Sequence, residues 1–270
     1  MTDPHQADPL DAGAVAPAGE APDTKRATQS PRAGLLAQIR AARPARAPAR
    51  ATIPAARAEL ARARRPRLVF AFDATASRAD TWASAQKITS KTFSVIPGAL
   101  DVALAVHGGD SLHTFTEFSA DVDEFRQHAA AITCVSGTTQ LCEIMARTLD
   151  AGGVRVLSYI GDAFEEDVDE VMGLSDRFKL RGIPVVLLAD QAEDDTLAVY
   201  RAIADRTGGA VLDFRASKLR VMGEMLVGVA TLAIGGRKLL EAQGTAGARL
   251  LIEHLPRSVS DPSRLASRGA

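Results

Sequence analysis

The sequence contains no long hydrophobic run. No stretch of the 270 residues approaches the roughly 18 consecutive apolar residues of a membrane-spanning helix. The start of the chain, residues 1–5, lacks the positively charged and apolar regions of a secretory signal. We therefore expect a soluble cytoplasmic protein that does not associate with a membrane.

The sequence is also poor in cysteine. Its two cysteines, Cys134 and Cys142, form no Cys-x-x-Cys motif. This spacing argues against a disulfide framework and against a structural zinc site, so we expect two small buried side chains. The histidines His107, His113 and His128 do not pair with a cysteine at a zinc-site spacing, and we expect no histidine to bind a metal.

The motifs of several enzyme classes are missing. The chain has no GxxxxGK(S/T) loop, no GxGxxG after its first apolar strand and no GxSxG turn. The strand that ends at Asp73 resembles the opening strand of the haloacid-dehalogenase phosphatases, which carry a nucleophilic Asp there. That family has a second Asp two positions later as its acid/base, and this chain has Thr75. Because the leaving group would lack a proton donor, we expect the protein not to be an enzyme.

The first 66 residues differ in composition from the rest of the chain. They contain few aromatic or β-branched residues and hold nine of the 13 prolines. Such a segment cannot bury enough apolar surface to offset its chain entropy, so we expect a disordered arm. Eleven Lys or Arg residues lie between positions 25 and 65, against one acidic residue. This basic arm is interpreted as a tether or docking segment, or as a segment that binds nucleic acid through its phosphates.

From residue 67 onward, apolar strand patterns alternate with amphipathic helix patterns. This alternation is typical of a doubly wound α/β domain with a mostly parallel sheet. The turn at 108–110 between two apolar runs predicts an antiparallel hairpin at one edge. We expect the domain to cover 67–243, followed by a short amphipathic element at 244–256, either helix or strand, and a loose tail at 257–270. The expected strands are 68–72, 100–106, 112–118, 154–160, 183–189 and 210–214, and the expected helices are 79–95, 121–131, 139–150, 165–181, 196–206 and 218–243, the last weakened at 235–236.

Oxygen-bearing side chains follow two of the buried strands. Asp73 follows the strand at 68–72, with Thr75 and Ser77 at two-residue steps, and Asp162 follows a later apolar strand. Strands this apolar are usually central in a parallel sheet, and their carboxyl ends meet at the crevice where such sheets bind ligands. Carboxylate and hydroxyl oxygens form a ligand set that suits Mg²⁺, Mn²⁺ or Ca²⁺.

Together with the hydroxyl-rich loop at 136–140, these residues resemble the metal-ion-dependent adhesion site (MIDAS) of the von Willebrand factor type A (vWA) domain. That pattern reads Asp-x-Ser-x-Ser, then a loop Thr, then an Asp at the end of a later strand. The sequence departs from it at Thr75, where the pattern has Ser, and at Ala163, where a Gly often follows the Asp. The resemblance assigns metal binding to Asp73, Thr75, Ser77, Thr138 and Asp162, with Thr139 as the fallback loop ligand.

Three of these residues also have a purely structural interpretation. Asp73 or Ser77 would cap the helix that follows the first strand, and Asp162 would cap the helix after the later strand, since Asp and Ser are favoured at helix N-termini. These roles remain alternatives to metal binding, and for Ser77 the two are compatible.

An acidic run at 165–170 follows Asp162. We expect it to be the solvated start of a helix, where negative charge complements the helix dipole. The alternative is that Glu165 or Glu166 reaches the metal through a water molecule.

The resemblance implies a function in protein binding. With only two protein carboxylates, a bound Mg²⁺ (alternatively Mn²⁺ or Ca²⁺) is left electrophilic toward an outside acid, and a Glu or Asp of a partner protein would complete its ligand shell. An AAA+ ATPase or a multi-component assembly is the implied kind of partner, and the Ala- and Arg-rich composition suggests a bacterial source. The alternative is a nucleic-acid-associated protein that binds through its basic arm, with the vWA-like domain as a scaffold. Arm binding would weaken steeply with salt and survive EDTA.

Overall fold

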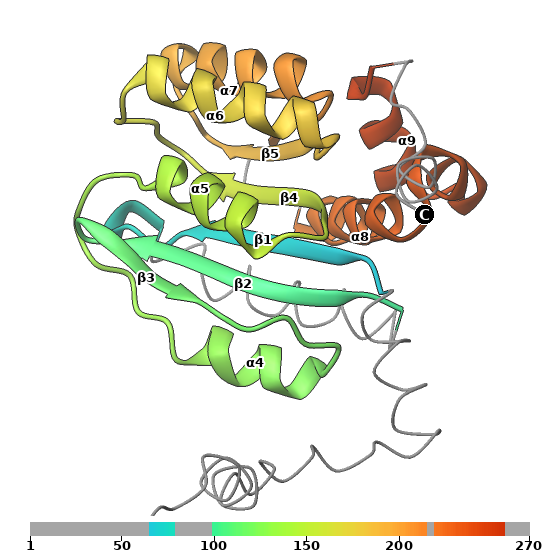
Figure 1. The fold of residues 1–270 in the computed structure, drawn as a ribbon, viewed down its shortest axis with the longest axis horizontal. Coiled ribbons are helices and arrows are strands. Elements are labelled where there is room, and N and C mark those ends of the chain that lie inside the picture. The colour runs from blue at the N-terminus through green and yellow to red at the C-terminus, as the bar shows by residue number, and fades with distance from the viewer. Residues whose placement is uncertain (1–64, 79–98, 215–218, 257–270) are drawn as a thin grey trace, which may run out of the picture. The chain divides into compact units, whose positions relative to one another are not determined.

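The computed structural model describes residues 65–78, 99–214 and 219–256. Within them, six strands form one sheet in the order β3-β2-β1-β4-β5-β6, and every neighbouring pair is parallel except β2 and β3 (Figure 1). The strands are β1 (Arg67–Asp73), β2 (Asp101–Gly108), β3 (Ser111–Phe115), β4 (Val154–Gly161), β5 (Val185–Asp190) and β6 (Ala210–Phe214). The helices are η1 (Ala76–Arg78, a 3₁₀ turn), α4 (Val122–Ala130), α5 (Leu141–Ala151), α6 (Val168–Arg181), α7 (Asp194–Thr207), α8 (Leu219–Gln243) and α9 (Ala246–His254). The predicted doubly wound α/β fold with an antiparallel edge hairpin is confirmed.

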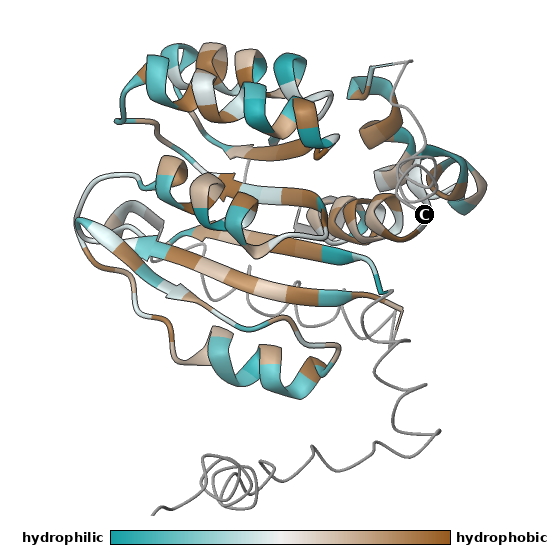
Figure 2. Cartoon of the chain, in the orientation of Figure 1, coloured by the Kyte–Doolittle hydropathy of each residue, from teal (hydrophilic) through white to brown (hydrophobic). Residues whose placement is uncertain are grey.

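Two hydrophobic layers hold this sheet between helices. Successive side chains of a strand point to opposite faces, so Phe70 and Phe72 of β1 pack with α4, α8 and α9, whereas Val69 and Ala71 pack with α5, α6 and α7. The strands are therefore apolar on both faces, as buried parallel strands must be. Figure 2 shows mainly apolar strands, with apolar and polar residues alternating around the outer helices. None of the described helices is long and apolar enough to cross a membrane.

The element that sequence patterns left open between helix and strand is helix α9, which packs against α8. Gly247 allows this close approach, because a Cβ there would lie 2.3 Å from the carbonyl carbon of Glu224. The predicted weak point of α8 is real: Gly236 has φ 66° and interrupts the helix. The helix expected at 79–95 lies outside the described residues, as do the first 64 residues of the arm and the tail at 257–270. The domain limits themselves stay a prediction.

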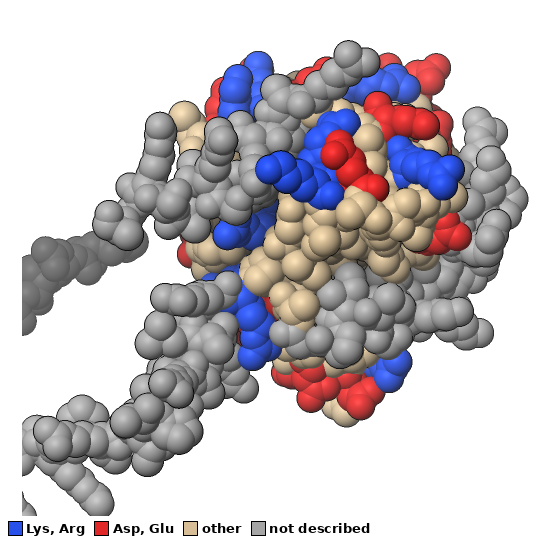
Figure 3. Space-filling model, turned by 90° about the vertical axis from the view of Figure 1, so that its right-hand side faces the viewer, with Lys and Arg blue, Asp and Glu red and all other residues tan. Residues whose placement is uncertain are grey.

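The Arg67 side chain anchors the end of the sheet where the parallel strands begin. Arg67 donates to the carbonyl oxygens of Ala151 and Gly152, each at 3.3 Å, and its guanidinium lies 4.7 Å from the Phe118 ring centroid. Figure 3 views the molecule from this end and shows acidic and basic side chains interspersed in its described part. These contacts hold the start of β1 in place. The candidate functional site lies at the opposite end of the strands.

The α8–α9 packing gives a stability prediction. Gly247→Ala should destabilise the domain by about 1–3 kcal/mol, because the added methyl group meets backbone that cannot yield. Gly173→Ala is the matched control, since a Cβ at Gly173 in α6 meets nothing within 4 Å. That control should stabilise the domain by about 0.5–1 kcal/mol through its helix propensity. Urea unfolding monitored by circular dichroism measures both changes, and equal effects of the two variants would contradict the packing.

Candidate functional site

The candidate site lies at the carboxyl ends of β1 and β4, which are neighbours in the centre of the sheet. From this pair the strand order runs one way through β2 and β3 and the other way through β5 and β6. Such a topological switch point leaves a crevice outside the strand ends, and open α/β sheets bind ligands there. Asp73 ends β1, and Asp162 directly follows β4.

Four of the five predicted metal ligands form one hydrogen-bonded chain. The backbone N–H of Thr75 donates to Asp73 Oδ1 at 2.8 Å, and the Thr75 and Ser77 hydroxyl oxygens are 3.0 Å apart. Ser77 Oγ donates to Asp162 Oδ2 at 2.9 Å. Because a hydroxyl has one proton and Ser77 gives it to Asp162, Thr75 is the donor to Ser77. Both hydroxyl oxygens therefore keep a lone pair for a further ligand.

The two carboxylates each have one oxygen without a hydrogen bond. Within the described part of the chain, Asp73 Oδ2 and Asp162 Oδ1 are buried and have no partner. Leaving buried charged oxygens unpaired is costly, and a cation between them would remove that cost. The described residues contain no group of three His, Cys, Asp or Glu that could hold a metal. A cation here would therefore depend on the hydroxyl oxygens as well as on the carboxylates, which is the ligand chemistry of Mg²⁺, Mn²⁺ or Ca²⁺.

The structure also decides one of the structural alternatives. Asp167, not Asp162, caps α6, because its side chain accepts from the backbone N–H of Glu170 at 2.9 Å. The interpretation of Asp162 as a helix cap is therefore wrong. The helix that Asp73 or Ser77 would cap lies outside the described residues.

A buried histidine that sequence reasoning did not connect with the site lies beside Asp73. His107 is the register partner of Asp73 in the neighbouring strand, and its Nδ1 is 4.0 Å from Asp73 Oδ1. Its Nε2 hydrogen-bonds the Tyr159 hydroxyl at 2.9 Å, and the two rings are stacked. Burial lowers the pKa of His107 to about 4, so the ring is neutral at pH 7 and leaves the charge of Asp73 uncompensated. The place of His107 beside Asp73 follows only from the register in which β1 and β2 pair, and the sequence patterns did not give that register.

Burial has the opposite effect on the neighbouring carboxyl group. It raises the pKa of Asp73 from 3.8 to about 6, with a further contribution from the negative charge of Asp162, while the hydrogen bond from the Thr75 backbone N–H acts against the rise. At pH 7 the Asp73 side chain is thus largely ionised although it is buried. A proton relieves this arrangement at low pH, and a cation would relieve it at neutral pH.

The two loop threonines lie near the site, but neither has a hydrogen bond to Asp73, Thr75, Ser77 or Asp162. Thr138 is exposed, and its hydroxyl makes a long 3.5 Å contact to Asp110 Oδ1 at the β2–β3 turn. Thr139 is buried, and its Oγ1 accepts from the backbone N–H of Glu165 at 2.9 Å. Gly137 packs directly on the backbone of Gly109, where a Cβ would lie 1.9 Å from the carbonyl oxygen.

The acidic run is only partly the solvated helix start that was predicted. Asp167 is exposed and caps α6, but Glu166 is half-buried and turns toward another helix. Its two carboxylate oxygens accept from the backbone N–H groups of Leu141 and Cys142, at 2.6 and 2.8 Å. The prediction is therefore wrong for Glu166. Burial, together with this carboxylate, raises the pKa of the Cys142 thiol well above its usual range, so this cysteine is an unreactive buried residue.

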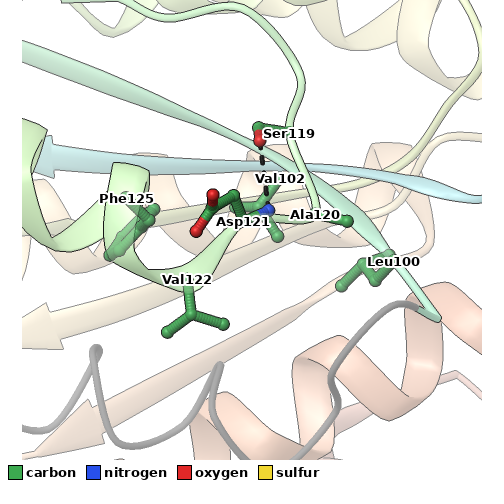
Figure 4. A pocket seen from close by; sticks show the side chains of 7 residues that line it. All are labelled: Leu100, Val102, Ser119, Ala120, Asp121, Val122 and Phe125. Carbon is green, nitrogen blue, oxygen red and sulfur yellow. Dashed lines mark hydrogen bonds between the residues drawn. The ribbon is translucent and has the colours of Figure 1, made fainter.

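A second hollow, between the start of β2 and α4, differs from this site. Apolar side chains dominate its lining (Figure 4). Its one carboxylate, Asp121, caps α4 by accepting from the backbone N–H groups of Asp123 and Glu124. The hollow therefore offers no converging polar groups to a ligand. Its lining residues are Leu100, Val102, Ser119, Ala120, Asp121, Val122 and Phe125.

The raised pKa of Asp73 predicts a pH dependence of stability in the absence of divalent cations. The folded-state pKa lies above the unfolded value, so ionised Asp73 destabilises the fold above about pH 6, and this penalty disappears as the pH falls to about 4. Asp73→Asn should therefore be more stable than wild type by about 1–3 kcal/mol at pH 7.5 in EDTA and equal to it at pH 4. Denaturant unfolding across this range measures the difference. Parallel pH curves for the two proteins would contradict the assignment.

Comparison with known proteins shows the fold. No protein-family profile and no curated protein matches the sequence. Among solved structures, proximal thread matrix protein 1 from the mussel byssus, with a zinc-occupied MIDAS motif, superposes with a TM-score of 0.50 at 13% identity. The match covers 60% of this chain and 45% of the mussel chain, so the chain spans less than half of that protein.

Two other matches have lower TM-scores and cover nearly all of the matched chains. An aerotolerance-related membrane protein from Bacteroides fragilis has a TM-score of 0.47 at 15% identity, over 60% of this chain and 98% of that one. The SpRpn10 VWA domain has a TM-score of 0.48 at 11% identity, over 58% and 94%. On the strength of the mussel structure and its own strand order, the chain carries a domain with the fold of von Willebrand factor type A domains.

Proposed function

We propose that the protein binds other proteins through a divalent cation held at the carboxyl ends of β1 and β4. The observation that carries the proposal is the pair of buried, unpartnered oxygens, Asp73 Oδ2 and Asp162 Oδ1. The other oxygens of the two carboxylates are linked through Thr75 and Ser77. Folding has placed two carboxylates and two hydroxyls together where no described group neutralises them. The structurally similar mussel protein holds zinc at its own MIDAS motif, which supports a cation at this position.

The described residues have distinct roles in this proposal. Ser77 and Thr75 would bind the cation directly through their free lone pairs, and Asp73 and Asp162 would bind it directly or through water. When bound, Mg²⁺ would supply a positive charge that two carboxylates only just balance, and it would retain exchangeable water positions. The all-oxygen donor set favours Mg²⁺, Mn²⁺ or Ca²⁺ over the softer metals.

Two threonines compete for the loop position. Thr138 makes two long, exposed contacts, donating to Asp110 Oδ1 at 3.5 Å and accepting from Gln140 Nε2 at 3.3 Å. Its hydroxyl is therefore released at little cost, and we assign it the loop role, direct or through water. Thr139 is the fallback, because its oxygen accepts one hydrogen bond from Glu165 and retains one lone pair.

The partner group that fits the remaining position is a carboxylate. An acidic side chain from another protein would complete the ligand shell with a further carboxylate oxygen, so recognition rather than catalysis is the proposed role. We propose a Glu or Asp of an AAA+ ATPase or of another multi-component assembly as its source. No observation favours the nucleic-acid alternative, since the arm on which it rests lies outside the described residues.

Metal binding should be visible as thermal stabilisation. Mg²⁺ at about 100 times its dissociation constant should stabilise wild type by about 2.7 kcal/mol, and Asp73→Ala should abolish this increment. Ser77→Ala should reduce it, because one direct ligand is lost. Asp123→Asn, which removes an exposed acid of α4, is the control and should respond as wild type does. Calorimetric titration gives the affinities, and an unchanged response of Asp73→Ala would refute the site.

The same titration distinguishes the loop threonines. Thr138→Ala should weaken Mg²⁺ binding while leaving stability in EDTA almost unchanged, since this side chain is exposed. Thr139→Val removes a buried hydroxyl that accepts a hydrogen bond, so it should lower stability in EDTA by about 1–3 kcal/mol. If Thr139→Val weakens Mg²⁺ binding and Thr138→Ala does not, then Thr139 is the loop ligand.

Partner capture from a native lysate should require both Mg²⁺ and Asp73. Alanine scanning of a captured partner should find one acidic residue whose loss costs about 2–5 kcal/mol, the usual cost of removing one member of a desolvated charge pair. Capture that survives EDTA and weakens steeply with salt would instead point to binding through the basic arm.

A further inference from the structure

One carboxylate near the site caps a helix that is distant from it in the sequence. Glu166 lies in the loop between β4 and α6, four residues after Asp162, and its two oxygens accept from the first two backbone N–H groups of α5. These residues are 24 and 25 positions apart in the sequence. The contact therefore joins two separate loops of the site rather than closing a local turn.

Helix α5 needs this distant cap. Its own N-cap residue, Gln140, makes no side-chain hydrogen bond to the helix. The N-terminal N–H groups of a helix have no intrahelical partner and carry partial positive charge, so a carboxylate is the strongest cap available to them. Glu166 satisfies two of these groups, and its own charge is balanced by them. These two hydrogen bonds hold the Glu166 carboxylate away from its alternative role, which was to reach the metal through a water molecule.

A second hydrogen bond joins the same two loops as the contact of Glu166 with Leu141 and Cys142, which we call the Glu166 clamp. Thr139 Oγ1 accepts from the backbone N–H of Glu165, so two successive residues after Asp162 hold the loop threonine and the start of α5. On the other side, Ser77 joins the β1 loop to Asp162. All three segments that would supply ligands are therefore connected through the single loop at 162–166.

We propose that Glu166 is a positioning residue that fixes the threonine loop relative to Asp162 and so preorganises the cation site. This rests on the proposed cation site. Partners that orient metal ligands typically contribute 10–100-fold to metal affinity. The loop at 136–140 leads directly into α5, so freeing the start of that helix also frees the loop that carries Thr138, while Thr139 keeps its bond from the Glu165 backbone N–H. Loss of the clamp therefore separates the ligands without removing any of them.

The experiment compares two Glu166 variants with a control from the same loop. Glu166→Gln keeps one acceptor oxygen and loses the charge, whereas Glu166→Asp keeps the charge but is too short to reach both N–H groups. Asp167→Asn also removes one charge and one helix cap, yet its cap lies on α6 and does not touch the threonine loop. Circular dichroism sets a temperature at which every variant is folded before Mg²⁺ affinity is measured by calorimetry.

Both Glu166 variants should bind Mg²⁺ about tenfold or more weakly than wild type, and Asp167→Asn should remain within about twofold. Hydrogen–deuterium exchange in EDTA supplies a readout that needs no metal: the amides of Leu141 and Cys142 should exchange faster in the Glu166 variants only. Unchanged Mg²⁺ affinity in both variants, with wild type binding normally, would overturn the positioning role and leave the cation site standing. If wild type itself binds no Mg²⁺, the proposed function fails, and Glu166 is then only a helix cap.

Discussion

The pairing of β1 with β4 is the constraint on which the rest of the site depends. It brings Asp73, which is buried, and Asp162, which is half-buried, to the same end of neighbouring central strands. The Ser77 hydroxyl donates to Asp162 Oδ2 and the Thr75 backbone N–H donates to Asp73 Oδ1, so two of the four carboxylate oxygens have a hydrogen bond. The neighbouring His107 ring adds no counter-charge at pH 7, because burial lowers its pKa to about 4. The fold therefore concentrates negative charge that its described residues do not balance.

Backbone contacts restrict the loops around Asp73 and Asp162. Gly137 rests on Gly109, and the backbone N–H of Val135 donates to the carbonyl oxygen of Ala74 at 3.0 Å. The Glu166 clamp then ties the start of α5 to the loop after β4. A site built in this way recognises a ligand at small entropic cost, because the groups that bind it are ordered beforehand. The arrangement suits a cation that must bind and still present an open position to a partner.

Sequence patterns predicted much of this architecture because its signals are local. Strands apolar on both faces predicted a central parallel sheet, and polar residues at their ends predicted that Asp73 and Asp162 meet. Three features were beyond such reasoning. The cap by Glu166 joins distant segments, the place of His107 depends on strand register, and α9 is too short for its periodicity to separate helix from strand. Asp162 was given a helix-capping alternative that Asp167 in fact fulfils, since both acids precede the same helix and only the backbone path distinguishes them.

The central claim is that one divalent cation binds between Asp73 and Asp162, and anomalous scattering from a crystal soaked in Mn²⁺ tests it most directly. The account predicts a single strong peak at this end of the sheet, within about 2.5 Å of the Ser77 and Thr75 hydroxyl oxygens. It also predicts that Asp73→Ala removes the peak under the same soak. A map with no peak there, or with Mn²⁺ bound only at other acidic residues, would contradict the account.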